Sequence, residues 1–134
     1  MLFPAETAVF LLGGPGDLPA CEAIREALPG HQALNVAGRL SFLESAALME
    51  NAAMNYVNDS APMHMASAVN APTTAVFCST IPAFGFTPLA QNALVVETGE
   101  ALDCRPCGLH GYKSCPKGHF RCAETIDPVV FKIP

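Results

Sequence analysis

The sequence predicts an α/β fold, a Rossmann-like doubly wound parallel sheet. Short apolar runs alternate with segments of helical periodicity, which is the order expected of parallel strands joined through helices. Several of these runs are apolar throughout, as in strands that are buried on both faces. The expected strands cover residues 7–12, 33–36, 52–57, 73–77 and 93–97.

The composition is that of one globular domain. Hydrophobic residues make up 51% and charged residues 14% of the 134-residue chain, which argues against disorder. No apolar run reaches the roughly 18 residues needed to cross a bilayer, so we expect no transmembrane segment. The N-terminus lacks the basic segment of a signal peptide, which favours a cytoplasmic location. The net charge of −5 and the absence of Trp argue against nucleic-acid binding.

A glycine-rich turn follows the first expected strand. It contains Gly13, Gly14 and Gly16 and ends at Asp17, which is placed to cap a helix over residues 17–28. Glycines let a backbone turn sharply and approach a ligand closely. The full dinucleotide-binding fingerprint is absent, however, and a tight turn without a ligand is the commoner meaning of such a cluster.

Two further helices are expected after the second and third strands. Ser41 and Glu44 have the spacing of a capping box, which predicts a helix that continues to about residue 51 and packs one face, including Leu43, on the sheet. Pro62 suits the first turn of a helix over residues 62–69, because its missing N–H would be unpaired there in any case. Asp59 or Ser60 is placed to cap this helix.

The stretch 58–64, Asn-Asp-Ser-Ala-Pro-Met-His, joins the third strand to that helix. Ligands of open α/β sheets bind at the carboxyl ends of the strands. The free N–H groups and the positive end of the helix dipole there favour an anion, so we expect a phosphate or diphosphate over residues 59–64. The alternative is a capped helix that binds nothing.

The last part of the chain differs from the rest and defines a second region. Residues 1–103 carry two Arg or Lys residues against ten carboxylates, whereas residues 104–134 carry five against two. This basic tail also holds four of the six cysteines. In a chain without a secretory signal, such a cluster favours metal over disulfides, although disulfides or reduced thiols remain alternatives. The candidate ligands of a structural zinc are Cys104, Cys107, Cys115 and Cys122.

The remaining cysteines, Cys21 and Cys78, are expected to be buried as small hydrophobic residues.

Taken together, these stretches resemble the C-terminal part of glycosyltransferase family 9, the heptosyltransferases of lipopolysaccharide core synthesis. The most specific piece is the Asn-Asp-Ser-x-Pro-Met-His run at 58–64. The other stretches that carry the resemblance are 11–17, 36–44, 71–73, 77–80 and the cysteine pattern of the tail. The resemblance implies one half of a GT-B fold, a nucleotide-sugar donor such as an ADP-heptose, and a lipid-linked saccharide acceptor at the inner face of the cell membrane. It also implies no metal requirement for catalysis.

The resemblance also implies roles for single residues. Asp59 is expected to face the donor sugar as a catalytic residue. The donor diphosphate is expected to contact Ser60, Ala61 and His64. The nucleoside is expected near Gly13, Gly14, Asp17 and Leu40.

The sequence also departs from the family pattern. Ala61 stands where the family usually has Gly, and Cys78 and Ser79 replace a commoner Gly-Pro. The family's acceptor-binding N-terminal domain and the first strand of its C-terminal domain find no counterpart in these residues. We therefore expect a donor-binding domain that transfers sugar poorly by itself. The alternative is an inactive fragment or a metal-stapled interaction module.

Overall fold

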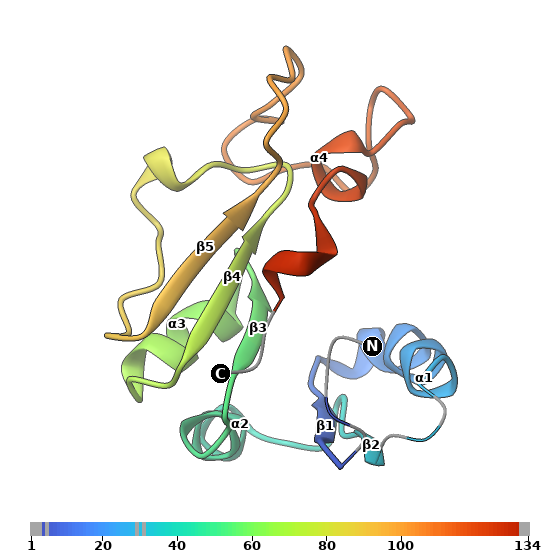
Figure 1. Ribbon diagram of the computed structural model, residues 1–134, viewed down its shortest axis with the longest axis vertical. Helices are drawn as coiled ribbons and strands as arrows, with labels where there is room; N and C mark the ends of the chain where they lie inside the picture. Colours follow the sequence, from blue (N-terminus) through green and yellow to red (C-terminus); the bar gives the residue numbers. More distant parts are fainter. Residues whose placement is uncertain (1–3, 5, 29, 31, 132–134) are drawn as a thin grey trace.

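The computed structural model describes residues 4, 6–28, 30 and 32–131. Strands and helices alternate along the first hundred residues (Figure 1). The strands are β1 (Ala8–Leu11), β2 (Gln32–Asn35), β3 (Asn55–Asn58), β4 (Thr73–Phe77) and β5 (Ala93–Glu97). The helices are α1 (Leu18–Glu26), α2 (Phe42–Glu50), α3 (Ala61–Ala68) and α4 (Arg121–Glu124). Short 3-10 turns lie at Pro15–Asp17, Pro82–Phe84 and Pro128–Val130.

All strand pairs in the described part of the chain are parallel, as the sequence predicts, but they form two sheets rather than one. The first sheet has the order β1-β2 and the second the order β3-β4-β5. Figure 1 shows the second sheet beside the smaller one, which lies with α1 at the lower right. Within these residues the predicted parallel strands are divided between two sheets, because no described strand bridges β1 and β3.

The core lies in the larger sheet and the helices that cover it. Phe77 and Ala75 of β4 and Met63 and Ala66 of α3 are fully buried, and Met49 of α2 packs with them. Helix α3 packs on β3 and β4, while α2 packs on α3. This unit therefore has the packed interior that fixes the turn between β3 and α3.

The β1–α1–β2 unit is much less buried. Phe10 of β1 is 42% exposed and Leu34 of β2 is 54% exposed. Within α1 only Cys21 is buried, and Ile24 is 49% exposed. This unit therefore has an apolar face that no described part of the chain covers.

The helix starts were predicted with mixed success. The capping box at α2 is confirmed, since the Ser41 hydroxyl accepts the Glu44 N–H at 3.3 Å and the Glu44 carboxylate accepts the Ser41 N–H at 2.8 Å. The backbone N–H of Ser41 holds the pKa of Glu44 below its ordinary value. The predicted packing of Leu43 is wrong, because this residue is 83% exposed in the first turn of α2.

The predictions of side-chain caps at the starts of α1 and α3 are wrong. Asp17 precedes α1 but makes no cap hydrogen bond, because its carboxylate accepts the Gly14 N–H at 2.8 Å instead. Ser60 precedes α3 and also makes no side-chain cap. The Asp59 carboxylate is engaged by another residue, described below, so neither predicted residue caps α3.

Candidate functional site

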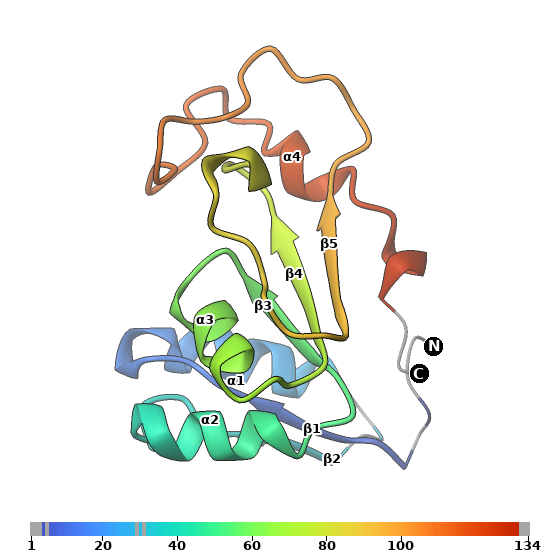
Figure 2. The same ribbon diagram turned by 90° about the vertical axis from the view of Figure 1, so that its left-hand side faces the viewer.

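The predicted site residues lie in turns at the carboxyl ends of strands. Gly13, Gly14 and Asp17 follow β1, and Leu40 follows β2. Asp59 and Ser60 follow β3 and lead directly into α3, which carries Ala61 and His64. Figure 2 shows the turn after β1 and the turn before α3 on the same side of the molecule. This is the edge at which an open α/β sheet binds its ligands.

The Asp59 carboxylate is held by a residue from the turn that follows the next strand, β4. The Thr80 hydroxyl donates to Asp59 Oδ2 at 2.6 Å, and Thr80 is only 8% exposed. The Asp59 N–H donates to the Val76 carbonyl of β4 at 3.2 Å, so both the backbone and the side chain of Asp59 are tied to β4 and its following turn. A carboxylate fixed in this way has one oriented position above the sheet.

The N-terminus of α3 presents polar groups at the surface. The Ser60 N–H donates to the Asn58 carbonyl at 2.8 Å, and Ser60 and Ala61 are both exposed. Because the Ser60 hydroxyl makes no cap bond and Pro62 has no N–H, this hydroxyl and the first helical turn are open to a ligand. The positive end of the helix dipole favours an anionic ligand there.

His64 lies one turn into α3 on its exposed side. Its ring meets the ring of Phe86 edge to face, with the centroids 6.4 Å apart. Phe86 belongs to the loop between β4 and β5 and is itself 55% exposed. The imidazole of this exposed residue is therefore contacted by one aromatic neighbour.

The turn after β1 is tightly built. A Cβ on Gly13 would lie 2.6 Å from the Cβ of Asp17, so only glycine fits there. The Gly38 N–H donates to the Gly13 carbonyl at 2.8 Å, and Gly38 has a φ of +71°, which favours glycine. The structure thus brings the turns after β1 and β2 together, with Leu40 half-buried beside them. Because the Asp17 carboxylate holds this turn, its expected contact with a nucleoside stays a prediction.

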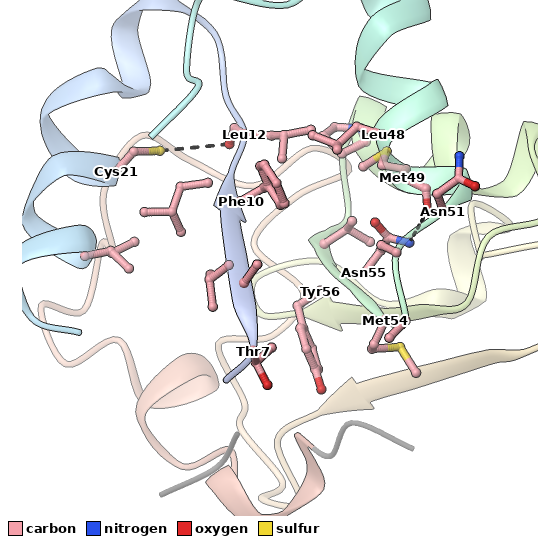
Figure 3. A pocket seen from close by; sticks show the side chains of 18 of the residues that line it. Thr7, Phe10, Leu12, Cys21, Leu48, Met49, Asn51, Met54, Asn55 and Tyr56 are labelled. Atoms are coloured by element: carbon pink, nitrogen blue, oxygen red, sulfur yellow. Dashed lines mark hydrogen bonds between the residues drawn. The ribbon is translucent and has the colours of Figure 1, made fainter. Parts of the chain in front are cut away.

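One cavity is lined by Ser60 and by no other of the predicted site residues. It has a volume of about 640 Å³ and lies between β1 and β3 (Figure 3). Its lining includes Leu12 at the end of β1 and Ser60 and Pro62 at the start of α3. The cavity therefore borders the α3 turn at Ser60 and ends at the residue before the glycine turn.

Two residues that the predicted site did not contain contribute to it. Thr80 orients Asp59, and the only sequence signal was its place in a polar turn after a strand. Arg105 comes from the tail and donates to the carbonyls of Cys78 at 2.7 Å and Thr80 at 2.9 Å. It also pairs with Glu97 at 2.6 Å. No local pattern marks Arg105, because its partners are 8 to 28 residues away in sequence.

The cysteine tail packs on the turn after β4. The Cys107 N–H donates to the Ser79 carbonyl at 2.8 Å, and Cys122 is buried as part of α4. The six cysteines are free thiols. Within the described ranges no three His, Cys, Asp or Glu side chains are grouped so that they could hold a metal ion. The described arrangement does not form a zinc tetrahedron, and the zinc site stays a prediction.

The two cysteines outside the tail differ in burial. Cys21 is buried as expected, whereas Cys78 is only half-buried. Burial raises the pKa of both thiols. The expectation of a fully buried Cys78 is wrong, because its turn is covered by the tail only in part.

The fold and site together define a class. A parallel α/β unit with a glycine turn, and with a polar strand-to-helix turn at the same edge, is the arrangement of nucleotide-binding domains. The family model "Glycosyltransferase family 9 (heptosyltransferase)" matches residues 1–112. The chain belongs to this family, which confirms the resemblance seen in the sequence.

Individual relatives give the same result. The chain is 36% identical over 110 residues to lipooligosaccharide heptosyltransferase 2 of Haemophilus influenzae, covering 78% of this chain and 32% of the relative. It is similar to the solved structure of E. coli ADP-heptose lps heptosyltransferase II, with 27% identity and a TM-score of 0.62, covering 75% of this chain and 33% of that one. It is also similar to the family 9 glycosyl transferase of Veillonella parvula, with 26% identity and a TM-score of 0.63, covering 72% and 27%.

Two statements follow from these similarities. The predicted fold class is confirmed as part of a GT-B glycosyltransferase. The chain spans about a third of the length of the relatives it matches. Separately, among the residues that the structure describes, no helix combines the length and apolar character that crossing a bilayer requires.

Proposed function

We propose that this chain is the donor-binding part of a family 9 glycosyltransferase and binds the diphosphate of an ADP-sugar at the start of α3. The observation that carries the proposal is the turn between β3 and α3. There an oriented Asp59, an uncapped Ser60 and an exposed His64 lie together at a helix N-terminus. The helix N-terminus with Ser60 and His64 suits the anionic diphosphate, and the Asp59 carboxylate suits the sugar that the diphosphate carries.

The proposed roles follow from the chemistry of these groups. The His64 imidazole donates to a phosphate oxygen, and Ser60 and the Ala61 N–H donate to the same diphosphate. The dipole of α3 stabilises the negative charge that develops on the leaving diphosphate. Asp59, held by Thr80 at 2.6 Å, faces the donor sugar.

The nucleoside and the acceptor are also part of the proposal. Adenosine lies near the glycine turn and Leu40, which the structure brings together at the ends of β1 and β2. The donor is ADP-heptose-like, in keeping with the relative described as an ADP-heptose heptosyltransferase. The acceptor is a lipid-linked saccharide, which a further part of the transferase must align with the donor. The proposed location is the cytoplasm, at the inner face of the membrane.

Calorimetric titration of the purified chain with ADP, and with UDP and GDP as controls, tests this function. We expect ADP to bind selectively and sugar transfer by the isolated chain to be slow or absent. A folded sample that binds none of the three nucleotides would contradict the proposal. That result would favour the alternative of an inactive fragment or interaction module.

A further inference from the structure

The loop between β4 and β5, residues 78–92, runs beside helix α3, as Figures 1 and 2 both show. Two hydrogen bonds tie its second half to the helix. The Leu89 N–H donates to the Ser67 hydroxyl at 3.0 Å. The Gln91 N–H donates to the side-chain oxygen of Asn70, just past the end of α3, at 2.8 Å. Because the contacts advance toward the end of the helix, the loop and the helix run in the same direction.

A turn fixes the first half of this loop. Pro82–Phe84 form a 3-10 turn, and the Gly85 N–H closes it by donating to the Pro82 carbonyl at 2.9 Å. Gly85 has a φ of +92°, a left-handed conformation that glycine adopts without strain. Phe86 comes next, between this turn and the hydrogen bond of Leu89. The backbone of Phe86 is therefore set from both sides.

Held in this way, the Phe86 ring lies against the His64 imidazole. The ring centroids are 6.4 Å apart and the ring planes are inclined by 81°, which is the edge-to-face arrangement that aromatic rings favour. Among the residues that the structure describes, none forms a hydrogen bond or an ion pair with this imidazole. The Phe86 ring is therefore the described side-chain contact that can restrict how the imidazole turns.

Burial does not explain the position of Phe86. The residue is 55% exposed, and it lies outside the buried core cluster that contains Phe77 and Met63. Leu89, three residues along the loop, is 80% exposed. The hydrophobic contribution of a side chain grows with the apolar area that it removes from water, so an exposed ring adds little to the core. The anchored loop therefore holds an aromatic ring at the surface, beside the start of α3.

The same loop reaches a second polar side chain of the candidate site. Thr80, two residues before the 3-10 turn, donates to the Asp59 carboxylate at 2.6 Å. The loop thus contacts Asp59 near its own start and His64 in its middle. Both side chains have proposed roles at the donor, one at the sugar and the other at the diphosphate.

We propose that Phe86 is a positioning residue of the donor site and holds the His64 imidazole in the orientation that donates to the diphosphate. This inference rests on the proposed function, because it requires the diphosphate to bind at the start of α3. Without the Phe86 ring, the imidazole turns among its staggered rotamers and becomes fixed only when the nucleotide binds. Fixing a side chain in this way weakens binding about three- to tenfold.

A double-mutant cycle on the full chain, with ADP as the ligand, tests this role. Calorimetric titration compares the unaltered chain, Phe86→Ala, His64→Ala and the double variant. We expect Phe86→Ala to weaken ADP binding about three- to tenfold when His64 is present. In the His64→Ala chain the same change is expected to have no effect, because the imidazole that the ring positions is gone.

Two further variants are controls for the loop. Phe86→Tyr keeps an aromatic ring at this position and is expected to bind ADP as the unaltered chain does. Leu89→Ala shortens a more exposed apolar side chain of the same loop but keeps the N–H that donates to Ser67. It is also expected to leave the ADP affinity unchanged. The melting temperature of each variant shows whether the chain remains folded.

The rotamer of His64 gives a readout that needs no nucleotide. NMR coupling constants across its Cα–Cβ bond are expected to show one rotamer in the unaltered chain and in Phe86→Tyr. In Phe86→Ala we expect values averaged over several rotamers. If Phe86→Ala fails to fold, the couplings of the unaltered chain still test whether the imidazole is held.

Distinct results would overturn the proposal. Equal weakening by Phe86→Ala in both backgrounds would mean that Phe86 contacts the nucleotide itself. Unchanged ADP affinity in Phe86→Ala, or averaged His64 couplings in the unaltered chain, would mean that the ring does not position the imidazole. A folded, unaltered chain that binds no ADP would overturn the proposed function and the role at the diphosphate with it. The couplings would then show separately whether Phe86 holds the imidazole.

Discussion

The hydroxyl of Thr80 and the carboxylate of Asp59 lie 2.6 Å apart and join the turns that follow two neighbouring strands. The Thr80 carbonyl in turn accepts a hydrogen bond of 2.9 Å from Arg105 of the tail. A continuous set of contacts therefore runs from the cysteine-rich tail to the carboxylate that we place at the donor sugar. We therefore predict that a substitution at Thr80 changes both the ADP affinity of the site and the free energy of unfolding.

Thr80→Val keeps the shape of the side chain and removes the hydroxyl. Asp59 would lose its partner, and we expect the free energy of unfolding to fall by about 1.5–3 kcal/mol, as for a hydrogen bond to a charged group. ADP affinity should fall as well, because the carboxylate no longer has a single orientation. Urea denaturation and calorimetric titration measure the two effects.

Thr73→Val is the matched control. The Thr73 hydroxyl is buried and donates to the Ala71 carbonyl at 2.8 Å, at the opposite end of β4. This variant should lose stability while binding ADP as the unaltered chain does. Equal loss of ADP affinity in both variants would mean that Thr80 affects the site only through general stability.

His64→Ala tests the proposed diphosphate contact. Loss of a charge-assisted hydrogen bond to a phosphate is expected to weaken ADP binding by about 1–3 kcal/mol. The exposed position of His64 on α3 predicts little change in melting temperature. His110→Ala, an equally exposed histidine in the tail, should leave the affinity unchanged. Unchanged ADP affinity in His64→Ala would assign the imidazole a structural role beside Phe86.

Much of the fold was predictable because its signals are local. The strands β4 and β5 have the predicted bounds, since each is a short apolar run between turn-forming residues. The capping box at Ser41 was predictable because both of its partners lie within one helical turn. The polar turn after β3 predicted an anion over residues 59–64, whereas the roles of Asp59, Ser60 and His64 came from the family resemblance and stay predictions.

The remaining features depend on contacts that sequence spacing does not encode. The Thr80–Asp59 bond joins residues 21 positions apart, and the Arg105 contacts depend on how the tail folds back. The Asp17 carboxylate was expected at the helix start, but the Gly14 N–H lies closer to it in the tight turn. The separation of β1 from β3 is likewise a property of the assembled sheets. The division into residues 1–103 and 104–134 stays a prediction.

Gly13→Ala tests how tightly the turn after β1 is built. The added Cβ would lie 2.6 Å from the Asp17 Cβ, which displaces Asp17 and its hydrogen bond to Gly14. We expect a loss of about 1–3 kcal/mol in the free energy of unfolding, as for other overpacked sites. Gly16→Ala is the control, because no atom lies within 4 Å of its added Cβ. Similar melting temperatures for the two variants would show that the turn relaxes freely.

The predicted zinc site is tested by a separate measurement. If Cys104, Cys107, Cys115 and Cys122 close around zinc, the purified chain should carry one zinc ion, and chelation should lower its melting temperature. Metal analysis before and after chelation, with thermal unfolding of each sample, tests this. An unchanged melting temperature after complete metal removal would leave the tail held by contacts such as those of Arg105 with the turn after β4.

Cys115 should be more reactive than Cys21, Cys78 and Cys122 in the metal-free chain. The Phe120 N–H donates to its sulfur at 3.4 Å and, with further N–H groups from Lys117 to His119, holds the pKa of Cys115 below its ordinary value. Burial has the opposite effect on Cys78 and Cys122 and raises the pKa of each thiol. Since the thiolate is the nucleophile, Cys115 should be alkylated before these thiols at neutral pH.

The pH dependence of alkylation gives the sign of each shift. The rate at Cys115 should reach half of its maximum at a lower pH than for an ordinary thiol, and the rates at Cys78 and Cys122 at a higher pH. Iodoacetamide labelling followed by peptide mass spectrometry resolves the three sites across pH 6 to 10, roughly the range in which perturbed thiols titrate. Labelling of Cys78 before Cys115 at every pH would mean that the N–H groups around Cys115 do not stabilise its thiolate in solution.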